Sequence, residues 1–96
     1  MSELPPDYEI SDPETGLIAC PCCGYATLGE RHGWEICDIC FWEDDGQDDH
    51  NADLRSPPND GLTLIEAREN FARIGACNQR CTKFVRPPRP DERRLR

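Results

Sequence analysis

CPCCG at residues 20–24 and CDIC at residues 37–40 decide the fold of this chain. Each stretch holds a C-x-x-C pair, and thirteen residues separate the two pairs. Two intervening residues let the backbone curl so that both sulfurs of a pair reach one ion, and this double-pair spacing is typical of structural zinc sites. The sequence therefore predicts one tetrahedral Zn²⁺ per chain. The predicted ligands are Cys20, Cys23, Cys37 and Cys40.

Two other uses of these cysteines stay open. A pair of disulfides would tie the same loops together, and an iron site is the other rival because four thiolates can hold either metal. The first pair with its following Gly24-Tyr25 resembles a rubredoxin-type iron site. The second pair is followed by Phe41 instead of glycine, and the spacer is short for that fold.

The redox compartment bears on this choice. The first residues are acidic and interrupted by Pro5 and Pro6, whereas a secretory signal would be basic and then apolar. No apolar run approaches the roughly 18 residues of a membrane span. We therefore expect a cytoplasmic protein, where thiols stay reduced and available to metal, and an odd count of seven cysteines also fits a closed disulfide set poorly.

Composition indicates that something besides apolar burial orders the chain. Leu, Ile, Val and Phe together make up 17 of 96 residues, below the roughly 20% that signals disorder in a chain of high charge. A domain of this size has a marginal hydrophobic core in any case. A bound metal would supply the missing constraint.

The charge is unevenly spread. Residues 1–60 carry −13 and residues 61–96 carry +5, for a net charge of −8. Nucleic-acid binding by the metal module is disfavoured, because phosphate recognition relies on clustered Lys and Arg. A basic segment remains as an alternative nucleic-acid surface. Its residues are Arg80, Lys83, Arg86, Arg89, Arg93, Arg94 and Arg96.

The expected organisation is an extended lead-in over residues 1–16, a single zinc-ribbon-like domain over 17–85 and a basic Pro/Arg-rich tail over 86–96. The prolines of residues 86–90 favour an exposed, polyproline-like start to the basic tail. Residues 17–19 are expected to form a short strand. The β-prone stretches 25–28 and 34–36 are expected to pair as a hairpin.

One helix is predicted with a clear start. Thr63 and Glu66 form an S/T-x-x-E capping box, apolar residues then recur at spacings of three and four, and Gly75 suits the position after the last turn. The helix over residues 63–74 should pack as a lid on the cysteine hairpin. The fold class expected is thus a small α+β metal-stabilised domain with a zinc-ribbon or rubredoxin-like knuckle hairpin, one packed helix and irregular tails.

The remaining thiols and the histidines lack a complete site. Cys22 is interpreted as an auxiliary thiol beside the ligands, and Cys77 and Cys81 as buried thiols, with a second metal half-site as the alternative. His32 and His50 are expected on the surface. The acidic stretch 43–53 lacks hydrophobic periodicity and calcium-loop spacing and is expected to be a solvated loop.

Three motifs together resemble the bacterial cysteine-rich CPCC domain family. They are CPCCGY at 20–25, EICDICFWEDDG at 35–46 and LIEARENF at 64–71, and VRPP at 85–88 extends the resemblance over residues 18–90. The resemblance implies a zinc-binding domain and supplies no mechanism.

A closed four-cysteine site leaves no coordination position for water or substrate, and no nucleophilic triad or phosphate-binding loop is evident. We therefore expect no catalytic residues and no enzyme. The expected function is a protein-interaction module, in one form an acidic binder or inhibitor of a basic partner. Burial of both tryptophan rings is the alternative to this surface. The predicted partner-binding residues are Trp34, Trp42, Glu43, Asp44 and Asp45.

Overall fold

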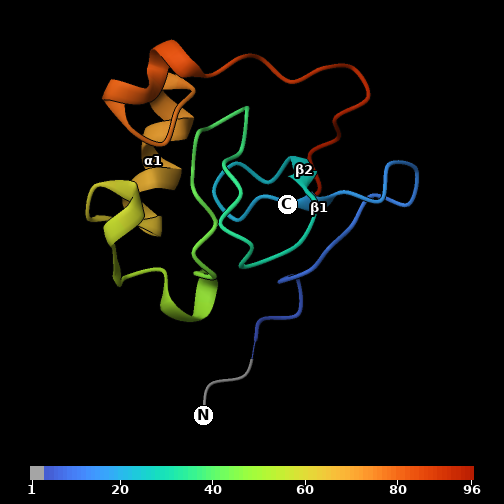
Figure 1. Cartoon of the computed structure of the whole chain (residues 1–96), viewed down its shortest axis with the longest axis horizontal. Helices are drawn as coiled ribbons and strands as arrows, with labels where there is room; N and C mark the ends of the chain where they lie inside the picture. The colour runs from blue at the N-terminus through green and yellow to red at the C-terminus, as the bar shows by residue number, and fades with distance from the viewer. Residues whose placement is uncertain (1–3) are drawn as a thin grey trace.

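The first cysteine pair lies in the loop of a short β-hairpin. In the computed structural model, which describes residues 4–96, strand β1 (Ile18–Ala19) pairs antiparallel with β2 (Ala26–Leu28), as Figure 1 shows. Ile18 lies opposite Leu28 and Ala19 opposite Ala26, with an irregularity between them. The strand expected at residues 17–19 is confirmed, and its partner is the chain that leaves the first cysteine pair.

The expected hairpin between residues 25–28 and 34–36 is wrong. Ile36 forms its β-bridge with Glu43 instead, so the second cysteine pair lies in a separate turn of its own. Trp34 has a φ of 63°, in the left-handed region, and a residue in that conformation cannot continue a strand. The chain therefore turns away before it could pair with β2.

A second two-stranded sheet leads into the helix. Strand β3 (Arg55–Ser56) pairs antiparallel with β4 (Leu62–Thr63), and the 3₁₀ turn η2 (Pro57–Asn59) lies between them. Another 3₁₀ turn, η1 (Asp49–Asn51), precedes this hairpin. Because β4 ends where the helix begins, the hairpin sets the position from which the helix crosses the cysteine loops.

Helix α1 (Leu64–Ile74) confirms the predicted start and end. The Thr63 hydroxyl accepts a hydrogen bond from the Glu66 amide at 3.1 Å, and the Glu66 carboxylate accepts one from the Thr63 amide at 2.9 Å. Gly75 follows with a φ of 75° and donates its amide hydrogen bond to the last turn. These bonds satisfy backbone groups that a helix end leaves unpaired.

The core forms around the cysteines. Leu64 and Ala67 of α1 are fully buried against the cysteine loops, with Trp42 among them, so the helix is the predicted lid. A further 3₁₀ segment, η3 (Gln79–Phe84), follows the helix. The fold class is confirmed as a small α+β domain with a knuckle-like cysteine site. The buried cluster comprises Cys20, Cys22, Cys23, Leu28, Cys37, Ile39, Cys40, Trp42, Ala52, Leu64, Ala67 and Cys77.

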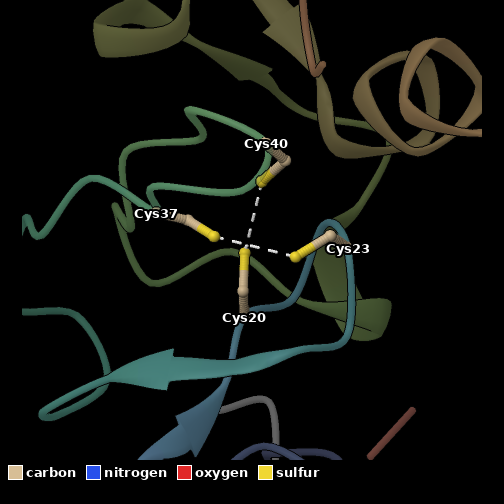
Figure 2. Close-up of side chains that lie close together, drawn as sticks. All are labelled: Cys20, Cys23, Cys37 and Cys40. Carbon is tan, nitrogen blue, oxygen red and sulfur yellow. Dashed lines mark hydrogen bonds between the residues drawn. The ribbon is translucent and has the colours of Figure 1, made fainter. Parts of the chain in front are cut away.

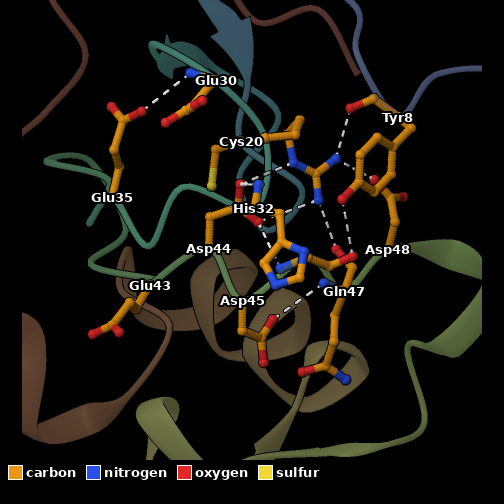
Figure 3. Close-up of polar contacts among 12 residues, drawn as sticks. Tyr8, Cys20, Glu30, His32, Glu35, Glu43, Asp44, Asp45, Gln47 and Asp48 are labelled. Atoms are coloured by element: carbon orange, nitrogen blue, oxygen red, sulfur yellow. Dashed lines mark hydrogen bonds and ion pairs between the residues drawn. The ribbon is translucent and has the colours of Figure 1, made fainter.

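A buried charge network holds the acidic stretch 43–53 against the rest of the domain. The Arg31 guanidinium bonds the carboxylates of Asp44 at 3.1 Å and Asp48 at 2.6 Å, and all three side chains are fully buried. Tyr8, labelled beside the two aspartates in Figure 3, has its ring centroid 3.9 Å from the guanidinium carbon of Arg31. The expectation of a solvated loop is therefore wrong for these two aspartates, because a buried cation from outside the stretch pairs with them.

Residues 93–96, at the end of the chain marked C in Figure 1, pair with residues 24–26 where the chain enters β2. The Ala26 amide donates to the Arg93 carbonyl at 3.0 Å, and the Leu95 amide donates to the Gly24 carbonyl at 2.8 Å. Residues 87–91 are exposed. Within the predicted basic tail, residues 87–91 extend into solvent as expected. Residues 93–96 instead pair with the backbone of residues 24–26, although the side chains of Arg93 and Arg94 remain exposed. Among residues 4–96, no helix has the length and apolar character that a membrane span requires.

Candidate metal centre

Four cysteine sulfurs converge at one point between the two loops (Figure 2). The Cys20 and Cys40 sulfurs are 3.6 Å apart, those of Cys23 and Cys37 are 3.7 Å apart, and all four lie within 4.8 Å of one another. Sulfurs placed tetrahedrally about 2.3 Å from a zinc ion would be separated by about 3.8 Å. The cluster has the size and donor set that a tetrahedral metal ion requires.

Both cysteine pairs use the same backbone turn. The Gly24 amide donates to the Cys20 carbonyl at 2.8 Å, and the Phe41 amide donates to the Cys37 carbonyl at 2.7 Å. Gly24 has a φ of 83° and Phe41 a φ of 71°. Phe41 thus adopts the left-handed conformation that glycine favours, and its ring stacks on Phe84 with centroids 5.1 Å apart. The missing second glycine does not prevent a second knuckle.

The four thiols lie in a site closed to solvent. They are 0% or 1% exposed, and burial raises the pKa of Cys20 and of Cys40. Hydrogen bonds from the neighbouring thiols, Cys20 first, and from Thr27 lower the pKa of Cys37. The Thr27 hydroxyl donates to the Cys37 sulfur at 3.1 Å. A cation would let all four sulfurs exist as thiolates here, and its binding would release their protons.

The cysteines of the structure are not paired as disulfides, which was one of the alternatives. All seven cysteines are free. The closest sulfurs of the cluster are 3.6 Å apart, far beyond the roughly 2.05 Å of a disulfide bond. A tetrahedral set of four sulfurs suits zinc or iron, so the donor set leaves the identity of the metal between these two.

Comparison with models of known protein families finds one match for this chain. The model of the family described as Cysteine-rich CPCC matches residues 18–92, which is most of the sequence and includes all four clustered cysteines. The chain belongs to the cysteine-rich CPCC family. The resemblance drawn from the three sequence motifs is thereby confirmed. No curated protein and no solved structure matched the chain.

The other three cysteines of this CPCC domain lie outside the four-sulfur group. Cys22 is 7% exposed and belongs to the buried cluster, and Cys77 and Cys81 are also buried. Among residues 4–96, neither of the groups able to hold a metal includes any of the three. Cys77 supports the second knuckle through its backbone, because its amide donates to the Cys40 carbonyl at 2.8 Å.

The histidines also stand apart from the metal centre. His32 and His50 are exposed, and neither belongs to a metal-capable group of the described residues. The His32 ring packs against Trp34, with centroids 5.3 Å apart. Both residues lie on the surface of the CPCC domain, as the sequence predicts.

The predicted partner-binding surface is only partly a surface. Trp42 and Asp44 are 0% exposed, so assigning them to it is wrong. Trp42 packs in the cysteine core, and Asp44 is held by the buried charge network. Trp34 is 55% exposed, whereas Glu43 and Asp45 are half-buried. Of the five residues, Trp34 retains the exposure that a partner contact needs.

Two residues that support the site were not predicted from the sequence. Arg31 ties the acidic stretch to the chain that links the cysteine pairs, and Thr27 places a hydroxyl on a cluster sulfur. A signal for Arg31 exists in the sequence, since Arg31 and Arg55 are the basic residues of the strongly acidic first 60. Thr27 carries no comparable signal, because its role depends on which face of β2 meets the second knuckle.

Proposed function

We propose that this CPCC domain is a non-catalytic protein-interaction module whose four clustered cysteines hold one structural Zn²⁺. The observation that carries the proposal is the closed site: four buried thiols supply a full tetrahedral set. Catalytic zinc sites keep one position open for water or substrate, whereas structural sites are filled by protein ligands. Such an ion orders loops and performs no hydrolysis.

Energetics support a structural role. The whole chain has 17 Leu, Ile, Val and Phe residues, and the buried cluster is centred on cysteines instead of aliphatic side chains. Structural zinc in small peptides contributes roughly 10–16 kcal/mol of apparent binding free energy at neutral pH. Since the net stability of a folded domain is only about 5–15 kcal/mol, removing the ion should unfold the two knuckles.

The proposed partner is a basic protein. The net charge of −8 favours attraction to a basic surface. Nucleic-acid binding through the basic segment is less well supported, because four of its seven cations already pair with acids of the same chain. These pairs are Arg80 with Asp60, Arg86 with Glu92, Arg93 with Asp12 and Arg96 with Asp48.

Elemental analysis of protein purified without added metal tests the metal assignment. The expected result is one zinc and no iron per chain, with loss of the native circular dichroism spectrum when a strong chelator removes the zinc. One iron per chain and a red colour would instead favour a rubredoxin-like electron carrier. A metal-free protein with a native spectrum would refute both.

Affinity capture tests the interaction role. Zinc-loaded protein should retain basic proteins at moderate salt, and Trp34→Ala should weaken that capture because it removes the exposed indole of the predicted contact surface. Capture of neutral or acidic proteins alone would contradict the basic-partner proposal. Leu54→Ala, which shortens another apolar side chain of similar exposure, is the matched control.

A further inference from the structure

Residues 93–96 pair with a backbone edge of the rest of the domain. This edge is the backbone of residues 24–26, which exchanges hydrogen bonds with the segment at Arg93 and Leu95 and forms an isolated antiparallel bridge at Arg94. This is the geometry of β-strand addition, in which main-chain bonds hold an extended peptide against a sheet edge. We name this edge and the carboxylates at its two ends the acidic groove.

Each end of the acidic groove binds one arginine through a two-pronged contact. At one end, Arg93 donates two hydrogen bonds to the Asp12 carboxylate, at 2.6 and 3.1 Å, and Asp12 is 1% exposed. At the other end, Arg96 donates two to the buried Asp48 carboxylate, at 2.6 and 3.0 Å. Paired bonds from one guanidinium to one carboxylate are strong and geometrically selective.

Further acids complete the Arg96 end. Its guanidinium lies 3.2 Å from the Asp7 carboxylate and 3.6 Å from that of Asp49. The carboxylate oxygens of Asp7, Asp48 and Asp49 lie as close together as those of a metal site. In this structure the cation among them is the Arg96 guanidinium. Arg68 also contacts Asp49, at 2.8 Å.

Gly24 fits the groove to its occupant and connects it to the metal centre. A Cβ atom at this position would collide with the backbone carbonyl of Arg96, so glycine is required for the close approach. The Gly24 amide also closes the first knuckle by bonding to the Cys20 carbonyl. The edge that receives the segment is therefore shaped by the same turn that places the metal-binding sulfurs.

We propose that the acidic groove is a recognition site for extended peptide segments with arginines three residues apart, and that residues 93–96 occupy it within the chain. The inference rests on the proposed function and specifies its partner as a basic segment that adds to the β2 edge. Backbone bonds to residues 24–26 supply affinity, and the carboxylates of Asp12 and Asp48 select the arginine spacing.

The internal occupant would act as a tethered competitor. Arg93 remains 49% exposed in its side chain, and the exposed residues 87–91 precede the segment. A tethered segment has an effective concentration of about 1 mM; for an open-groove Kd of about 0.1 mM it would occupy about nine-tenths of the molecules and weaken outside binding about tenfold. A partner must displace it.

Fluorescence polarisation with a labelled peptide DERRLR, which copies residues 91–96, tests the inference on the full chain. The release variant Arg93→Ala/Arg96→Ala removes both internal arginines, and its zinc content and circular dichroism report whether it is folded. A second release variant, Leu95→Pro, keeps both arginines and deletes the amide that bonds to the Gly24 carbonyl. A control peptide, RRRLDE, has the same composition and no arginines three apart.

The release variants should bind DERRLR about tenfold more tightly than the unaltered chain does. RRRLDE should bind at least tenfold more weakly than DERRLR, and adding Asp12→Asn to a release variant should reduce DERRLR binding. Equal binding of both peptides, or no gain in either zinc-loaded release variant, would overturn the inference and leave the proposed function standing. A metal-free, folded preparation would overturn the proposed function itself.

Discussion

Arg31 is the cation on which two buried carboxylates depend, and Arg31→Met removes that cation while filling similar space. Its guanidinium donates to Asp44 at 3.1 and 3.3 Å, to Asp48 at 2.6 Å, and to the carbonyls of Tyr8 at 2.6 Å and Gln47 at 2.8 Å. The side chain is fully buried. Methionine would remove the hydrogen bonds that Arg31 donates to these acceptors.

The size of the stability loss depends on which partners Asp44 and Asp48 keep when Arg31 is replaced. Asp48 keeps its contact with Arg96, whereas the ion pairs of Asp44 within residues 4–96 all go to Arg31. Asp44 keeps bonds from the backbone amides of His32 and Gly46, which lessen the loss. Breaking one partner of a buried ion pair typically costs about 3–5 kcal/mol. We predict a loss of about 3–5 kcal/mol in the free energy of unfolding.

Urea denaturation at a fixed excess of zinc measures this loss. Arg55→Met is the matched control, because Arg55 pairs with Glu66 at 3.4 Å across an exposed surface and should lose less than about 1 kcal/mol. The double variant Arg31→Met/Asp44→Asn should recover part of the stability, since the stranded charge is gone. A loss for Arg31→Met no larger than that of the control would refute the role assigned to the buried network.

Three further predictions concern single contacts. Thr27→Val, which deletes the hydroxyl bonded to the Cys37 sulfur, should weaken zinc affinity about tenfold in competition with a chromophoric chelator, and an unchanged affinity would contradict it. Thr63→Ala should lower the free energy of unfolding by about 1 kcal/mol through loss of the helix cap, and unaltered urea denaturation would argue against the cap. Hydrogen bonding to Arg93 lowers the pKa of Asp12 from 3.8 to about 2, so the pair stabilises the fold above about pH 4 and this contribution is lost as pH falls toward 2. An NMR titration of the Asp12 carboxyl carbon should show this, and Arg93→Ala should return the pKa toward its ordinary value.

Local patterns predicted much of this fold. The capping box at Thr63 and the glycine at position 75 gave the limits of α1, because caps depend on residues adjacent in sequence. The C-x-x-C spacing likewise predicted four converging sulfurs, since each pair is closed by one local turn. The left-handed turn at Phe41 went unpredicted, because the tertiary setting overrides the ordinary preference for glycine there.

The sequence by itself determined the four-cysteine cluster, the packed helix and the family, because each is written in short-range spacing. Only the tertiary structure decided that β2 pairs with β1, that Asp44 and Asp48 are buried, and that residues 93–96 fill the acidic groove. These contacts join residues far apart in the chain. Charged side chains ordinarily favour water, so their burial depends on a partner that three-dimensional packing alone brings into place.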